Sequence, residues 1–176
     1  MIFTGSKLPG AFVIEPERID DVRGFFAMNW SEEDFATRGL VSRFVESNIS
    51  YSHKQGTLRG MHYQARPYGQ FKLVRCTTGA ILDVIIDLRP DSPTFKQWEA
   101  VELSADNRLM LYVPLDFAHG FQTLVDGTEV AYQMSSTYHP KSSRGVRWDD
   151  PAFGISWPDA ERVIIARDRE YPDFKG

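Results

Sequence analysis

A succession of short runs rich in β-branched and aromatic residues constrains the fold of this chain more than any other feature of its sequence. Turn residues separate these runs, and very little helical pattern lies between them. Such punctuation is typical of a sandwich, a barrel or a jelly roll. We therefore predict an all-β fold. The predicted strands are Phe44–Ser50, Thr57–Gln64, Gln70–Thr77, Ala80–Leu88, Lys96–Ser104, Arg108–Val113, Gly120–Val125 and Thr128–Ser135.

Two short helices are the expected exceptions. Ser31 with Asp34 three residues later resembles a capping box, and Gly39 is placed to end the helix that follows. A second helical stretch is expected near Asp159–Val163. Before the first helix, the sequence predicts a strand around Ala11–Pro16 and then a tight bend at the glycine of D-V-R-G-F-F.

Length and composition favour one structural unit. The chain has 176 residues, of which 42% are hydrophobic, and no internal repeat, low-complexity tract or linker divides it. A chain of this size buries roughly two-thirds of its unfolded surface around one core. We predict a single domain over residues 1–176.

Charge and cysteine content argue against several classes of function. The net charge is −4 and the Lys and Arg residues are scattered, which is atypical of a nucleic-acid-binding surface. The single Cys76 excludes an intramolecular disulfide, and M-I-F-T-G-S-K-L-P-G lacks the pattern of a secretory signal. The longest apolar run, Ala80–Leu88, contains two aspartates and is far shorter than the ~20 residues that span a bilayer. We expect a cytoplasmic protein without nucleic-acid or membrane partners.

Strand alternation places several polar side chains on inward faces. Lys72 shares its face with Val74, Tyr132 shares its face with Val130, and His62 lies on the inner face of its own strand. Burying a lysine is costly unless a partner is present, so a functional role for Lys72 is as reasonable as a structural one. Taken alone, Tyr132 is also compatible with a core tyrosine whose hydroxyl is hydrogen-bonded.

Ordered sequence blocks resemble the signatures of one enzyme family. The blocks are G-T-L-R-G-M-H-Y-Q, K-L-V-R-C-T-T-G-A-I-L-D-V-I-I-D-L-R-P-D-S-P-T-F, P-L-D-F-A-H-G-F, V-A-Y-Q-M-S-S-T-Y and W-D-D-P-A-F-G-I-S-W-P. In the same order, they resemble those of the dTDP-4-dehydrorhamnose 3,5-epimerase family. The resemblance runs from D-V-R-G-F-F to Asp168, nearly the whole chain.

The resemblance implies a fold and an activity. The fold would be a cupin-type jelly roll, or double-stranded β-helix, with short flanking helices. The protein would be an isomerase, usually a homodimer that exchanges N-terminal strands, and would need no metal or dissociable cofactor. Its substrate would be a nucleoside-diphosphate 4-keto-6-deoxyhexose, most directly dTDP-4-dehydro-6-deoxy-D-glucose, in dTDP-rhamnose and lipopolysaccharide O-antigen biosynthesis.

Inverting a carbon beside a ketone requires a base, a group that stabilises the enolate oxygen, and an acid on the opposite face. The family pattern assigns these roles to His62, Lys72 and Tyr132 respectively. It pairs Asp168 with His62, where a carboxylate would fix the tautomer of the imidazole. Without the resemblance, Asp168 would be interpreted as a surface charge in A-R-D-R-E.

The remaining family positions concern substrate binding. Arg23 and Arg59 match phosphate-binding positions, a role that suits the planar guanidinium fork. Arg59 has the opposite parity to His62, so a twist or bulge around Gly60 would be needed to bring both to one site. Tyr138 matches a tyrosine that stacks on the nucleobase. The predicted substrate-binding set is completed by Asn48, His119, Arg167, Glu46 and Gln64.

Some positions depart from the family pattern. Met28 and Glu46 stand where many members have glutamate and glutamine near the nucleoside, and Ser143 replaces a glutamate. The nucleobase is therefore left open. Whether C3, C5 or both are inverted is also left open, because it depends on how the sugar turns against the same base and acid, which residue types do not decide.

Two rival functions fit the same fold. A metal-dependent cupin enzyme needs several histidines and a carboxylate on neighbouring strands, but Gln64 stands where a second histidine would be expected. We predict no metal ligands. A non-catalytic sugar-nucleotide-binding cupin would not be expected to retain His62, Lys72 and Tyr132 together.

Overall fold

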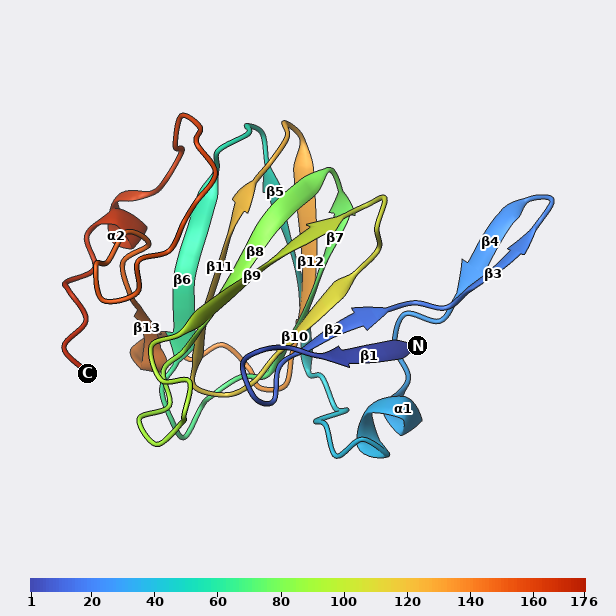
Figure 1. Ribbon diagram of the computed structural model, residues 1–176, viewed down its shortest axis with the longest axis horizontal. Coiled ribbons are helices and arrows are strands. Elements are labelled where there is room, and N and C mark those ends of the chain that lie inside the picture. The colour runs from blue at the N-terminus through green and yellow to red at the C-terminus, as the bar shows by residue number, and fades with distance from the viewer.

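The computed structural model describes residues 1–176, and antiparallel strands form two packed sheets (Figure 1). The strand order is β1-β2-β10-β7-β12-β5 in the six-stranded sheet and β13-β6-β11-β8-β9 in the five-stranded sheet. The architecture is the predicted all-β jelly roll. The first sheet contains β1 (Ile2–Gly5), β2 (Phe12–Glu15), β10 (Met110–Val113), β7 (Lys72–Thr78), β12 (Thr128–Met134) and β5 (Glu46–Ser52). The second contains β13 (Ser143–Gly145), β6 (Leu58–Gln64), β11 (Phe117–Thr123), β8 (Ala80–Asp87) and β9 (Trp98–Ser104).

Most predicted strands are confirmed, with shifted ends. β11 begins three residues before the predicted start, because Phe117 and Ala118 pair with Asp87 and Ile86 of β8. Four strands were not predicted from the sequence: β1, β13 and the two hairpin strands Arg18–Asp21 and Gly24–Ala27. β13 lacks any hydrophobic alternation and is a strand only because it pairs with the edge of β6.

Helix α1 (Glu32–Ala36) forms where its capping signal predicts it. The Ser31 side chain accepts a hydrogen bond from the Asp34 backbone N–H at 3.2 Å. The chain leaves the helix through a turn that reaches Gly39 at φ +69°, a conformation that glycine adopts without steric cost. Phe35 is fully buried against the outer face of the six-stranded sheet.

The second predicted helix is wrong in position. The segment around Asp159–Val163 is not helical, and helix α2 instead covers Ala166–Arg169. Val163 bridges to Thr57 beside β6, and its backbone N–H and C=O bond Gly56 and Leu58. Those tertiary hydrogen bonds occupy backbone groups that a local helix would need.

Both faces of each sheet carry apolar clusters. The largest cluster lies between the sheets and includes Val74, Ile85, Leu111 and Val130. A second covers the outer face of the five-stranded sheet with the C-terminal segment, including Phe153. A third is built around α1 on the other sheet. The inter-sheet core leaves one end of the sandwich available for a cavity.

A bulge in β6 changes the direction of its side chains. In the pairing with β11, His119 lies opposite His62, whereas Phe121 lies opposite Arg59. One extra residue of β6 is therefore accommodated between these pairs. Gly60 supplies it at φ +138°, and a Cβ there would lie 2.5 Å from Gly120 Cα. Glycine is required because the two backbones approach so closely.

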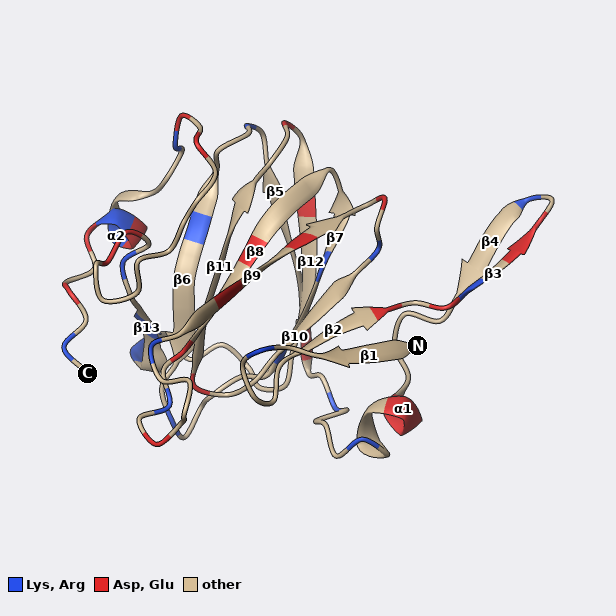
Figure 2. Cartoon of the chain, viewed as in Figure 1, with Lys and Arg blue, Asp and Glu red and all other residues tan.

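The β3 (Arg18–Asp21) and β4 (Gly24–Ala27) hairpin projects away from both sheets (Figure 1). Its apolar side chains Ile19, Val22 and Phe26 are exposed. Charged residues of both signs lie near its tip, as elsewhere on the chain (Figure 2). By contrast, β1 and β2 pair with each other, and β2 pairs with β10 of the same chain. None of the helices is long and apolar enough to cross a membrane.

Candidate active site

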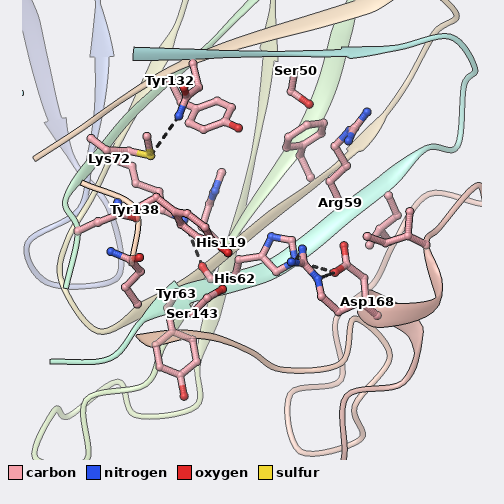
Figure 3. A pocket seen from close by; sticks show the side chains of 18 of the residues that line it. Ser50, Arg59, His62, Tyr63, Lys72, His119, Tyr132, Tyr138, Ser143 and Asp168 are labelled. Atoms are coloured by element: carbon pink, nitrogen blue, oxygen red, sulfur yellow. Dashed lines mark hydrogen bonds and ion pairs between the residues drawn. The ribbon is translucent and has the colours of Figure 1, made fainter. Parts of the chain in front are cut away.

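A cavity of about 470 Å³ opens between the two sheets (Figure 3). One wall comes from β5, β7 and β12, and the other from β6, β11 and β13. The chain leading into α2 lies across one side. Predicted site residues that line this cavity are His62, Lys72, Tyr132, Asp168, Asn48, Arg59, Gln64, His119, Tyr138 and Arg167. The structure therefore brings ten of the twelve predicted site residues together around one space.

A histidine and a buried carboxylate are hydrogen-bonded at one side of the cavity. His62 Nε2 lies 2.7 Å from Asp168 Oδ1, and only 2% of the Asp168 side chain is exposed. Asp168 also accepts hydrogen bonds from the Gly60 backbone N–H at 3.2 Å and from Arg167 Nε at 3.1 Å. Its bond to His62 occupies Nε2 and leaves Nδ1 as the ring nitrogen without a protein partner.

The surroundings set the protonation of this pair. Burial lowers the pKa of His62, the Asp168 carboxylate partly offsets that effect, and the nearby Lys72 and Arg167 cations lower the pKa further. Burial acts to raise the pKa of Asp168, but its hydrogen bonds from His62, Gly60 and Arg167 bring it below its ordinary value. At neutral pH, His62 is therefore a neutral base oriented by an ionised carboxylate.

Lys72 places a cation on the opposite sheet. The residue is buried, and its Nζ donates to the His62 carbonyl oxygen at 3.2 Å. Burial lowers the pKa of Lys72 to about 8, and the Asp83 carboxylate acts in the opposite direction. The ammonium form therefore predominates at neutral pH and is lost as the pH rises through about 8.

Tyr132 reaches the cavity from the sheet opposite His62. Tyr132 and His62 are labelled in Figure 3. In the strand pairing, β12 places Tyr132 between Asn48 of β5 and Val74 of β7. Burial raises the pKa of Tyr132, while the Arg59 cation acts to lower it. Its hydroxyl has no hydrogen-bond partner within the protein, so it is free to donate to a bound molecule.

A second histidine–carboxylate pair lies deeper in the cavity. His119 Nε2 is 2.7 Å from Asp83 Oδ1, and both residues are buried. The other oxygen, Asp83 Oδ2, has no hydrogen-bond partner. His119 was among the predicted site residues, but Asp83 was not. A charged residue on the inner face of the apolar run Ala80–Leu88 was the available signal for Asp83.

In a regular strand, Arg59 and His62 would point to opposite faces. The bulge in β6 brings both side chains to the cavity. Arg59 Nε donates to Ser52 Oγ at 3.2 Å, and Arg59 Nη2 donates to the Tyr51 carbonyl at 2.9 Å. These bonds hold the guanidinium at the open side of the cavity, with the remaining donors available.

Arg23 and Glu46 do not line the cavity of their own chain. Arg23 lies at the tip of the projecting hairpin, where 86% of its side chain is exposed and its Nη2 lies 2.6 Å from Asp21 Oδ2. Glu46 accepts a hydrogen bond from the Tyr138 backbone N–H at 3.1 Å.

Tyr171 is a cavity neighbour that the sequence did not reveal. Its ring meets the His62 ring edge-to-face, with 6.3 Å between centroids. Gly145 pairs with His62 across the β13–β6 ladder, and a Cβ on Gly145 would lie 2.3 Å from the Tyr171 ring. A glycine there lets the C-terminal segment pack behind the histidine. No local motif marks Tyr171, because its position depends on long-range packing.

The donor set is not arranged like a metal centre. No three residues among His, Cys, Asp and Glu lie together in a way that could hold a metal ion. Each cavity histidine instead binds one carboxylate. The arrangement suits proton transfer at a carbon beside a carbonyl, because a neutral base, a buried cation and an un-ionised phenol share the cavity.

An antiparallel jelly roll with such groups between its sheets falls in the cupin class of folds. The chain belongs to the dTDP-4-dehydrorhamnose 3,5-epimerase family, whose model matches residues 5–176.

Individual relatives support this assignment. A dTDP-4-dehydrorhamnose 3,5-epimerase of Methanothermobacter thermautotrophicus is 46% identical, over 98% of this chain and 94% of the relative. The Bacillus anthracis enzyme of that name, crystallised with TDP and PPi bound, has a TM-score of 0.94 and 42% identity, covering 98% of this chain and 99% of that chain. A Streptomyces niveus dTDP-4-dehydrorhamnose 3-epimerase is 36% identical, over 93% of this chain and 79% of the relative.

The charge of Lys72 provides a direct test of the site. We expect its amine to titrate near pH 8, and the Asp83→Asn variant to titrate lower because a carboxylate that favours the ammonium is gone. NMR titration of ¹³C-labelled lysine methylene groups measures this, with Lys72→Arg used to assign the signal. Titration of Lys72 near the ordinary value of about 10.4 would contradict the proposed burial of its charge.

Proposed function

We propose that this chain epimerises a nucleoside-diphosphate 4-keto-6-deoxyhexose at C3, C5 or both. The most direct substrate is dTDP-4-dehydro-6-deoxy-D-glucose, converted to dTDP-4-dehydro-L-rhamnose for dTDP-rhamnose and cell-surface polysaccharide biosynthesis. The observation that carries the proposal is the placement of His62 and Tyr132 on opposite sheets of one cavity, with Lys72 beside them.

In the first step, His62 acts as the base. Its free Nδ1 removes the proton from the carbon next to the ketone, and the C–H electron pair moves into the C–C bond as the carbonyl becomes an enolate. The ring then carries a positive charge. Asp168, ionised and hydrogen-bonded to Nε2, stabilises this imidazolium and keeps the ring oriented.

The Lys72 ammonium stabilises the negative charge that develops on the ketone oxygen. A fixed cation acts strongly in a site that excludes water, and losing such a group typically costs about 10²–10³ in rate. His119 also faces this part of the cavity and is held by Asp83. It is available as a second hydrogen-bonding group for the same oxygen.

Tyr132 returns a proton from the opposite side. Its raised pKa keeps the phenol protonated at neutral pH, so it can donate to the enolate carbon. Proton removal on one face and return on the other inverts the carbon. After this step His62 holds the abstracted proton and Tyr132 is a phenolate, so solvent must take the proton from His62 and reprotonate Tyr132 before either group acts again. Inversion at the second carbon also requires the sugar to turn, so that the same base and acid flank that carbon. One 36% identical relative is named a 3-epimerase, which refers to a single carbon. Inversion at one carbon is therefore the alternative to inversion at both.

The nucleotide is proposed to lie at the open side of the cavity. Arg59 and Arg167 supply guanidinium donors for the diphosphate, and Tyr138 provides an aromatic surface for the base. We favour dTDP because the Bacillus anthracis relative binds TDP. Met28, Glu46 and Ser143 differ from many members near the predicted nucleoside position.

We further propose a homodimer in which the hairpin of each chain completes the other chain's site. The outward face of β5 exposes Ile49 and Tyr51, and the hairpin exposes Ile19 and Phe26. Burying such apolar groups against a second copy is favourable. The projecting hairpin carries Arg23 beyond its own cavity, where it could reach a partner's diphosphate. The exchanged element would then be β3–β4.

The proposed enzyme works in the cytoplasm and uses no metal or dissociable cofactor. A buried free Cys76 and a site of acid–base side chains are consistent with this setting and chemistry. Metal analysis of protein purified without an affinity tag, combined with turnover, tests the rival metal-dependent reading.

Solvent exchange tests the reaction directly. In deuterated buffer, the wild-type protein should place deuterium at C3 and C5 of dTDP-4-keto-6-deoxyglucose, as read by NMR. His62→Ala should slow exchange at least about 100-fold because the base is lost. Tyr132→Phe should retain exchange at one carbon while blocking inversion. His53→Ala, a change of an exposed histidine outside the cavity, is the matched control. Unchanged C–H bonds after long incubation with the wild type would reject this substrate.

A mixed dimer tests the shared site. We expect Arg23→Ala and His62→Ala homodimers each to be weak. A purified heterodimer of the two should recover about half of the wild-type activity, because one of its two sites is intact. Coexpression with two different tags supplies the heterodimer. If the hairpin serves its own chain, both sites of the heterodimer are defective, and no recovery is seen.

A further inference from the structure

The segment Thr137–His139 lies at the cavity mouth and is held by two side chains from different strands. Its three consecutive residues each contribute one backbone group to these bonds. Gln64 of β6 bonds the first and third residues, and Glu46 of β5 bonds the second. We call this arrangement the Tyr138 clamp. The clamp fixes the backbone on both sides of the Tyr138 side chain.

Both amide donors of Gln64, and one of the two lone pairs of its amide oxygen, are used within the protein. Its Nε2 donates to the Tyr68 carbonyl at 2.7 Å and to the Thr137 carbonyl at 3.2 Å. Its Oε1 accepts from the His139 backbone N–H at 2.6 Å. Both N–H groups of the amide are used, and the side chain is buried. A substrate could accept a hydrogen bond from Gln64 Nε2 only by displacing the Tyr68 or Thr137 carbonyl.

Glu46 completes the clamp from outside the cavity. Its Oε1 accepts from the Tyr138 backbone N–H at 3.1 Å, and the residue does not line the cavity. Only a hydrogen-bond acceptor is needed for this contact, so glutamine could replace the carboxylate there.

Tyr138 needs such support because little else fixes it. The residue is 55% exposed, and its side chain makes no hydrogen bond. The ring of the following residue, His139, stacks on Tyr68 with 3.7 Å between centroids. Because Gln64 also bonds the Tyr68 carbonyl, its amide group joins the loop that contains Tyr68 to the segment Thr137–His139.

We infer that Gln64 and Glu46 are positioning residues that act through Tyr138, rather than groups that contact the substrate. The inference rests on the proposed binding of a nucleotide sugar and assigns these two residues to its nucleotide end. Holding the aromatic ring in place before binding reduces the conformational entropy lost when a base stacks on it. The clamp therefore strengthens nucleotide binding and leaves the proton-transfer groups unchanged.

A double-mutant cycle separates this role from direct contact. Affinity for dTDP is measured by calorimetry for the wild type, Gln64→Ala, Tyr138→Ala and the double variant. Each single change should weaken binding by about tenfold, the effect of losing one stacking contact. The double variant should be no weaker than Tyr138→Ala, because the clamp then has nothing to position. Independent, multiplying losses would overturn the inference.

Variants of Glu46 test the second half of the clamp. Glu46→Gln should retain wild-type affinity and Glu46→Ala should lose it, because only alanine removes the acceptor. For both Gln64→Ala and Glu46→Ala, KM should rise while kcat stays within about twofold, as expected for a binding role. The exposed Gln97, whose side chain makes no hydrogen bond, provides the matched Gln→Ala control. Equal affinities of Glu46→Ala and the wild type would overturn this assignment.

Amide hydrogen exchange tests the clamp without any substrate. In the ligand-free protein, the Tyr138 and His139 amides should exchange at least about tenfold faster in Gln64→Ala than in the wild type, while β8 amides keep their protection. Unchanged exchange of both amides would overturn the clamp. Failure of the proposed reaction would instead be seen as missing deuterium incorporation in the wild type, which this measurement does not involve.

Discussion

The arrangement of the cavity depends on the hydrogen bonds of one buried carboxylate, Asp168. It bonds the His62 ring and the Gly60 backbone on β6, and it belongs to a helix far along the chain. A carboxylate with so little exposure is stable only when hydrogen bonds replace its lost water. Its three donors do this, and they fix the orientation of the histidine at the same time. The C-terminal segment therefore contributes to the chemistry as well as to packing.

The jelly roll makes this possible by dividing its interior. Apolar residues fill the inter-sheet space at one end, while histidine–carboxylate pairs and Lys72 occupy the other. Burial lowers the pKa of His62 and of Lys72 and raises that of Tyr132. The same low-dielectric surroundings thus produce a neutral base, a cation that is lost near pH 8, and a protonated phenol.

Much of this could be predicted from sequence because it follows from local patterns. Alternation along single strands correctly turns Lys72 and Tyr132 inward, and opposite parity correctly requires a bulge between Arg59 and His62. The positions of segments that depend on tertiary contacts were harder to predict. The second helix was misplaced because its predicted segment pairs with β6, and Tyr171 was missed because only folding brings it behind His62. The family resemblance, not periodicity, identified Asp168. The residue roles themselves remain predictions.

The most direct test is a crystal structure with dTDP-6-deoxy-D-glucose, an analogue whose 4-hydroxyl replaces the ketone and which therefore cannot form the enolate. The proposed mechanism requires His62 Nδ1 and Tyr132 Oη on opposite faces of the sugar ring, each about 3–3.5 Å from C3 or C5. It also requires Lys72 Nζ within about 3.2 Å of the 4-oxygen. A sugar with both groups on one face, or with its 4-oxygen directed away from Lys72, would contradict the mechanism.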